Sequence, residues 1–230
     1  MAARVVENRR ITFRVPHSGM VPPAYLHGRT ELPWNSMKRA NSMEVQRMNH
    51  RQAMDFLKVE TNRRYTATPS STFCNVAAHD FATVWGAYLP RIWWTKAAID
   101  RMIQNREKVE PVYGAGVTTE LNANALFDWF INWGHRFGYA QYSETGAQEL
   151  VDKGGFAVVV AKNVDLRKSG HISVVLPSEM MDLRVVKPIP EDTKAPLQWN
   201  AGRFNRERFK TEWYKNKTRF SSWLIWGIKP

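Results

Sequence analysis

The fold can be predicted from one stretch, Ser71-Thr72-Phe73-Cys74-Asn75-Val76. A loop rich in Ser and Thr (residues 66–73) ends here, and Gly86 and Pro90 close the segment that follows. Between them, apolar residues recur at spacings of three and four, which is typical of a buried helix: Ala77, Ala78, Phe81, Ala82, Val84, Trp85 and Tyr88. Cys74 is therefore predicted to lie in the first turn of a buried helix.

The rest of the chain shows helical patterns first and strand patterns later. The helical patterns cover residues 43–58, 95–104, 122–133 and 143–153. The strand patterns cover residues 156–161, 171–176, 197–201 and 220–228. This order predicts an α+β fold with helices packed on one side of an antiparallel sheet. We expect one domain over residues 41–230, after an irregular N-terminal extension over residues 1–40 that is rich in Pro and Gly.

Composition excludes several classes of protein. The chain has 230 residues, with 33 Lys and Arg against 21 Asp and Glu, a net charge of +12 and a single cysteine. One cysteine excludes an internal disulfide and a cysteine-rich zinc site. No apolar run is long enough to span a membrane, and no secretory signal is visible at the N-terminus. Residues 1–64 hold 12 Lys and Arg against five Asp and Glu, so the positive charge is concentrated there.

The lone thiol could serve as a nucleophile. A helix N-terminus and a nearby histidine both lower the pKa of a thiol. Cys74 is predicted to lie at a helix N-terminus, and its own N–H could help bind an oxyanion. His171 begins a predicted strand after Ser169-Gly170, so it could supply the second. On the next predicted strand, Gln198 or Asn200 could orient the imidazole, while Trp199 between them should face away.

Each of these residues also has a structural interpretation. A single cysteine on an apolar helix is most often a filler of the core, and His171, Gln198 and Asn200 could be ordinary surface residues. The order of a Cys at a helix start, a Gly-His at a strand start and a polar residue on the next strand favours catalysis. We expect no cofactor and no metal site, because nucleotide-binding loops, HExxH and GxSxG motifs are absent.

Several motifs taken together resemble the NlpC/P60 and CHAP group of papain-like cysteine amidases. They are Asn62-Arg63-Arg64-Tyr65, Ser71 to Val76, Asp80, Gly86 to Pro90, Gly154 to Val159, Gly170 to Pro177 and Gln198 to Gly202. The resemblance covers residues 43–227. It implies a papain-like fold with Cys74 as the nucleophile at the N-terminus of the central helix, His171 as the base and Gln198 as the imidazole orienter, with Asn200 in reserve. It also implies that Tyr65 and Asn75 shape the site.

Members of the family mostly cleave amide bonds in peptidoglycan stem peptides. The resemblance therefore implies peptidoglycan as the substrate and acyl transfer through a Cys74 thioester as the mechanism. Two routes to the cell wall fit a chain without a visible signal: a type VI secretion effector delivered to the target periplasm, or a phage lysin. An effector toxin implies an immunity protein as partner.

Two other functions stay open. The first is a papain-like hydrolase acting on a protein or a lipid, because motif residues determine the chemistry and not the substrate. The second is nucleic-acid binding, because residues 203–219 combine basic with aromatic side chains. No helix-turn-helix, zinc-finger or RNP motif supports the second, so we expect no nucleic-acid partner. The stretch could equally be a solvated helix face. The oligomeric state cannot be predicted.

Overall fold

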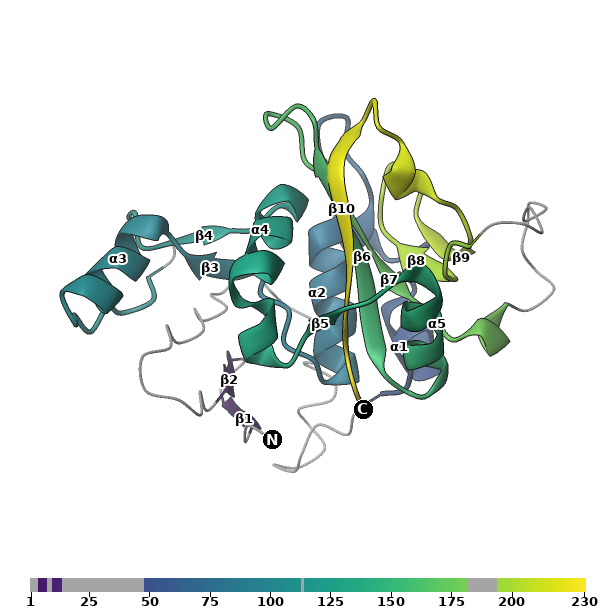
Figure 1. Ribbon diagram of the computed structural model, residues 1–230, viewed down its shortest axis with the longest axis horizontal. Helices are drawn as coiled ribbons and strands as arrows, with labels where there is room; N and C mark the ends of the chain where they lie inside the picture. The colour runs from purple at the N-terminus through teal and green to yellow at the C-terminus, as the bar shows by residue number, and fades with distance from the viewer. Residues whose placement is uncertain (1–3, 8–9, 14–47, 113, 182–193) are drawn as a thin grey trace. The chain divides into compact units, whose positions relative to one another are not determined.

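The chain divides into two compact units. The computed structural model describes residues 4–7, 10–13, 48–112, 114–181 and 194–230 (Figure 1). One unit combines Met1–Gln46 with Pro90–Leu121, and the other combines Arg47–Leu89 with Asn122–Pro230. We predicted one domain over residues 41–230, whereas residues 90–121 belong to the unit that contains the N-terminal residues. Most of the predicted extension over residues 1–40 lies outside the described residues.

The first unit contains two short antiparallel strand pairs and one helix. Strand β1 (Arg4–Glu7) pairs with β2 (Arg10–Phe13), within the extension that we expected to be irregular. Strand β3 (Ile92–Trp94) pairs with β4 (Thr118–Glu120), a pair that we did not predict. Helix α3 (Lys96–Gln104) was predicted and begins at Thr95, whose Oγ1 accepts the Ala98 N–H.

The second unit is built on a six-stranded sheet in which every pair is antiparallel. Its strand order is β5-β10-β6-β7-β8-β9. The strands are β5 (Ala140–Gln141), β6 (Phe156–Asn163), β7 (His171–Val175), β8 (Gln198–Asn200), β9 (Arg206–Phe209) and β10 (Phe220–Ile228). The described chain has five α-helices and antiparallel sheets, which confirms the α+β class.

One face of this sheet packs against two helices, and a third helix packs on one of these two. Strand residues Phe156, Val158, Val160, Ile172, Val174 and Trp199 share this face, because paired residues in the antiparallel register point the same way. Helix α2 (Cys74–Trp85) crosses it, with the ring centroid of Phe81 5.0 Å from that of Trp199. Helix α4 (Ala123–Trp133) packs on β6 next to α2, and α1 (His50–Leu57) packs on α2 (Figure 1). Of the helix predicted over 43–58, residues 43–47 lie outside the described residues.

The opposite face is also covered, so the prediction of helices on one side only is wrong. Helix α5 (Glu144–Asp152) places Ala147, Leu150 and Val151 against Ala157, Val159, Ala161 and Val175. Tyr214 of the short helix η6 (Trp213–Lys215) extends the same cluster. Strand β6 begins with a continuous apolar run, so it is apolar on both faces. This is the pattern expected of a strand that is covered on both faces. Three further single turns connect elements: η3 (Arg63–Tyr65), η4 (Gly134–Phe137) and η5 (Ser178–Met180).

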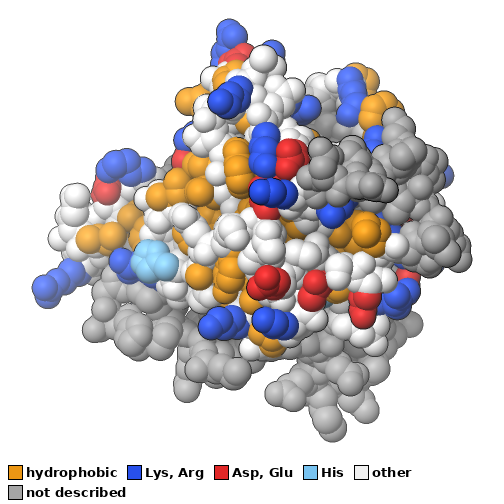
Figure 2. Space-filling view, turned by 45° about the vertical axis from the view of Figure 1, so that its right-hand side comes forward, with side chains coloured by type: hydrophobic (Ala, Val, Ile, Leu, Met, Phe, Trp, Pro, Cys, Tyr) orange, Lys and Arg blue, Asp and Glu red, His pale blue; other side chains and the backbone are white. Residues whose placement is uncertain are grey.

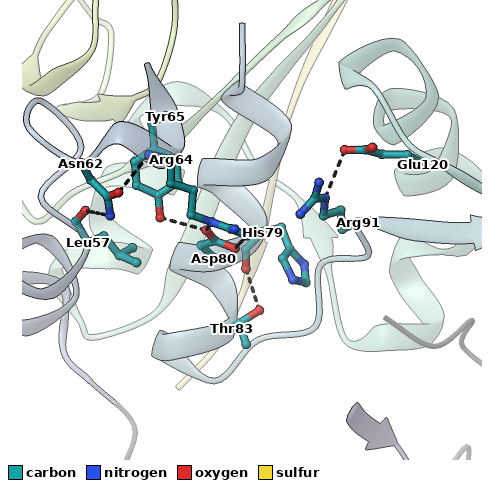
Figure 3. A network of polar contacts seen from close by, with 9 residues as sticks. All are labelled: Leu57, Asn62, Arg64, Tyr65, His79, Asp80, Thr83, Arg91 and Glu120. Atoms are coloured by element: carbon teal, nitrogen blue, oxygen red, sulfur yellow. Dashed lines mark hydrogen bonds and ion pairs between the residues drawn. The ribbon is translucent and has the colours of Figure 1, made fainter. Parts of the chain in front are cut away.

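A buried carboxylate ties the segment before the Ser/Thr loop to α2 (Figure 3). Asp80 is fully buried in the middle of the helix. Arg64 donates to it from Nε at 2.6 Å and from Nη2 at 3.2 Å, and the Tyr65 hydroxyl donates at 2.8 Å. A bidentate guanidinium and a hydroxyl together satisfy a charge that would otherwise be costly to bury.

Removing the charge of Asp80 should destabilise the protein strongly. Asp80→Asn leaves the Arg64 guanidinium without its counter-charge, and we expect the free energy of unfolding to fall by about 3–5 kcal/mol. Tyr65→Phe removes one hydrogen bond to the same carboxylate and should cost about 1.5–3 kcal/mol. Urea unfolding of both variants measures the difference. A cost for Asp80→Asn no greater than that for Tyr65→Phe contradicts this role of the ion pair.

A second buried polar residue, His50, makes stability depend on pH. It begins α1 and lies against the rings of Phe81 and Trp85, with 3% of its surface exposed. Burial lowers its pKa from 6.5 to about 4. In the unfolded chain the imidazole binds a proton as the pH falls below 6.5, whereas in the folded protein it stays neutral until about pH 4. Stability is therefore lost as the pH falls from 6.5 towards 4.

Replacing His50 with leucine should remove this part of the acid sensitivity. Between pH 7 and pH 5 we expect His50 to account for about 2 kcal/mol of lost stability. Urea unfolding at both pH values measures the loss for the original protein and for His50→Leu. The matched control is His135→Leu at an exposed position, which should keep the full loss. An equal acid loss in the His50→Leu variant contradicts the assignment.

Candidate active site

Cys74 is the first residue of α2 and lies at the end of the sheet where β7 begins. Its side chain is buried, and the preceding residue Phe73 makes no side-chain cap at this helix end. Burial raises the pKa of the Cys74 thiol, while backbone N–H groups of Ile172, Asn75 and Cys74 and the charge of Arg219 act to lower the pKa. Because burial has the largest effect, the resting thiol keeps its proton.

His171 is the first residue of β7 and is fixed there by close backbone contacts. It pairs with Ala161 of β6. The preceding Gly170 cannot carry a side chain, because a Cβ there would lie 2.1 Å from the Ala161 carbonyl oxygen and 2.7 Å from Asn124 Oδ1. Asn124 also donates to the Lys168 carbonyl at 2.8 Å, so α4 holds the turn that leads into His171.

The imidazole of His171 has two neighbours on the same face of the sheet. Its Nε2 lies 3.3 Å from Asn200 Nδ2. The Trp213 ring contacts it edge-on, with centroids 4.6 Å apart and planes at 77°. Burial, together with the positive charge of Arg219, lowers the pKa of His171 from 6.5 to about 4. The imidazole is therefore neutral at physiological pH and can accept a proton.

The structure links Cys74 to the residue that follows His171. The Ile172 N–H is directed at the Cys74 sulfur, and Ile172 is the residue after His171. Helix α2 packs on β7, which fixes this approach. The thiol and the imidazole, both of which the structure describes, are not directly hydrogen-bonded. They lie on adjacent elements, α2 and β7.

The side chain of Gln198, which was predicted to orient the imidazole, is hydrogen-bonded to other groups. Its Oε1 accepts from Ser173 Oγ at 2.7 Å and from Trp213 Nε1 at 2.8 Å. Its Nε2 donates to the carbonyls of Pro196 at 3.2 Å and Thr211 at 3.1 Å. The amide has thus used its hydrogen-bonding capacity elsewhere.

Asn200, the reserve candidate, occupies the predicted position instead. Strand β8 pairs Trp199 with Val174 and Gln198 with Val175. Continuing this register places Asn200 opposite Ser173, a diagonal neighbour of His171, whereas Gln198 is two residues further away. Trp199 lies on the opposite face from Asn200, as predicted, and its ring packs on Phe81 of α2.

Gln198 acts on the site indirectly, through Trp213. The Gln198 carbonyl holds the Trp213 indole, and the indole covers one side of the His171 ring. Trp213 was not predicted, because residues 203–219 looked like a basic surface stretch; the structure forms β9 and η6 there.

The two predicted site-shaping residues have different places. Tyr65 is buried, with its hydroxyl on Asp80 and its ring 6.3 Å from that of Trp199, so it supports α2 and does not line the site. Asn75 lies in the first turn of α2, and its backbone N–H is directed at the sulfur. It therefore contributes to the site through its backbone.

Within the described residues, no group of three or more His, Cys, Asp or Glu side chains could hold a metal ion. In the same part of the chain, no helix is both long and apolar enough to cross a membrane. No protein-family model matches the chain. No curated protein matches it, and no solved structure does either.

Substitutions at Gln198 and Asn200 should separate support from catalysis. We expect Asn200→Ala to lower kcat by about 10-fold to 100-fold with little change in stability, because the imidazole loses its partner. Gln198→Ala should instead lower the free energy of unfolding by about 2–4 kcal/mol, because it leaves buried polar groups unpaired. Urea unfolding and kinetics of both variants check this. A stable, inactive Gln198→Ala together with a fully active Asn200→Ala contradicts the assignment.

Proposed function

We propose that this protein is a papain-like cysteine hydrolase of the NlpC/P60 type that cleaves amide bonds in peptidoglycan stem peptides. The observation that carries the proposal is the approach of the Cys74 helix start to the β7 backbone beside His171, with Asn200 at the imidazole Nε2. The proposal requires these three residues, which lie far apart in sequence, to act together in acyl transfer. The peptidoglycan substrate rests on the family resemblance.

In the proposed reaction, His171 Nδ1 takes the thiol proton as the Cys74 sulfur attacks the carbonyl carbon. The Nε2 of His171 must then carry a hydrogen and needs an acceptor. Asn200 Oδ1 is buried without a hydrogen-bond partner among the described residues, and a 180° rotation of the amide would place it on Nε2. His171 then protonates the leaving amine, and water hydrolyses the thioester.

The first turn of α2 would stabilise the oxyanion. The N–H groups of Cys74 and Asn75 already face the sulfur, and no side chain caps this helix end. Backbone N–H groups at a helix N-terminus favour developing negative charge on the substrate oxygen. Oxyanion binding by these N–H groups does not require a thiolate–imidazolium ion pair before the substrate binds.

The biological setting remains part of the proposal. We favour an antibacterial effector that acts in the target periplasm, with an immunity protein as partner. A phage lysin with the same chemistry is the alternative. Analysis of purified sacculi by mass spectrometry identifies the bond that is cut. Cleavage of a protein or lipid substrate with the sacculi left intact would favour the other papain-like hydrolases.

Nucleic-acid binding has less support than hydrolysis. On the face drawn in Figure 2, Lys and Arg side chains are scattered among apolar and acidic ones and do not form one continuous stripe. In the basic C-terminal stretch, Lys215 is paired with Glu144 at 3.0 Å and with Glu212 at 2.8 Å. Micromolar DNA binding with a steep salt dependence would favour this alternative.

Cys74→Ala and His171→Ala should abolish peptidoglycan cleavage. We expect a loss of at least about 10³-fold in kcat for each, because the nucleophile and the base act as a unit. The acid limb of the rate should lie near pH 4, because His171 accepts no proton once it is protonated. Muropeptides released from sacculi are quantified by mass spectrometry.

The exposed His135 supplies the control, since His135→Ala should cleave as fast as the original protein. The melting temperatures of the two inactive variants should stay within a few degrees. Full activity of either Cys74→Ala or His171→Ala on purified peptidoglycan contradicts the proposed function.

A further inference from the structure

We infer that Arg219 is a specificity residue that binds a carboxylate of the substrate beside the scissile amide. The inference rests on the proposed function and deepens it, because it names the substrate class: amides with an acidic group next to the bond that is cut. It requires that Arg219 lies near the site and that its charge is available.

A chain of ring contacts connects Arg219 to His171. The guanidinium carbon of Arg219 lies 5.1 Å from the ring centroid of Phe220. The Phe220 ring lies 5.3 Å from that of Trp213, and the Trp213 ring lies 4.6 Å from that of His171. Trp213 and Phe220 thus form an aromatic wall between the guanidinium and the imidazole.

The sheet register independently puts both residues at the same end. Phe220 pairs with Asn163 of β6, and the Arg219 carbonyl accepts the Val164 N–H at 3.0 Å. His171 pairs with Ala161 on the other side of the same strand. The charge of Arg219 accordingly acts on both Cys74 and His171.

The charge of Arg219 is not used within the described structure. Its side chain is exposed and forms no ion pair with any carboxylate that the structure describes. Two other cations at this end of the sheet have acidic partners: Lys162 pairs with Asp128 at 2.7 Å and Arg167 pairs with Asp165 at 3.0 Å. An unpaired guanidinium held against an aromatic wall is suited to bind a carboxylate in a bidentate manner.

The single cysteine allows a test that does not depend on knowing the substrate. Iodoacetate and iodoacetamide both alkylate a thiolate with loss of iodide, and Cys74 is the only thiol in the chain. They differ by one carboxylate, so the ratio of their rates reports attraction of an anion to the site. Any change in the thiol pKa affects both reagents equally and cancels in the ratio.

We expect Arg219→Gln to lower the iodoacetate-to-iodoacetamide rate ratio by roughly twofold to fivefold, as for the loss of one exposed charge pair. Arg219→Lys should keep most of the ratio. The matched control is Lys217→Gln, which removes the same charge from an exposed position two residues away and should leave the ratio unchanged. An equal fall in Arg219→Gln and Lys217→Gln, or no fall in either, overturns the inference.

An NMR titration gives a second readout that is independent of the buried thiol. Acetate should shift the Arg219 Nε–H resonance, while acetamide should not, and equal shifts overturn the inference. The two proposals can fail separately. If the iodoacetate-to-iodoacetamide ratio depends on Arg219 but peptidoglycan is not cleaved, the proposed function is refuted and the anion site is supported. Cleavage of acidic and amidated peptides at rates that Arg219→Gln lowers equally would refute the anion site and leave the hydrolase intact.

Discussion

The structure of the second unit depends on the buried carboxylate of Asp80. A charge in the middle of a buried helix is tolerated only with partners, and Arg64 and Tyr65 supply them. The segment that carries these two residues is thereby fixed against α2. Asn205, in the turn after β8, donates to the carbonyls of Val59 and Tyr65 at 2.9 Å and 3.1 Å. The Asp80 charge and Asn205 together link α2, the segment before it and the turn that follows the strand of Asn200.

A second network holds the imidazole, and it does so from the other face of the sheet. Gln198 connects Ser173 of β7 with Trp213, and Trp213 covers His171. The thiol approaches from the α2 face, and it meets β7 at the Ile172 backbone. Because each half of the site is fixed by its own buried polar network, neither depends on a flexible loop for its position.

Much of the second unit could be predicted because its elements have strong local patterns. Helices α2, α4 and α5 and strands β6, β7 and β10 follow the apolar periodicity closely. Strands β3, β4 and β9 are short or polar and gave no such pattern. Alternation places Gln198 and Asn200 on one face, so only the strand register could distinguish them. Trp213 and Arg219 reach the site through contacts across the sheet, which no local pattern records.

The electrostatics of the site limit what Arg219 can do. Its charge lowers the pKa of both Cys74 and His171, which favours the thiolate but opposes the imidazolium. Proton transfer from the thiol to the imidazole creates both ions, so these two effects oppose each other. Burial acts on the pair in one direction only, since it disfavours both ions and keeps the resting site neutral. A cation whose effects on the proton transfer oppose each other contributes little to that step, and its remaining role is to attract an anion to the site.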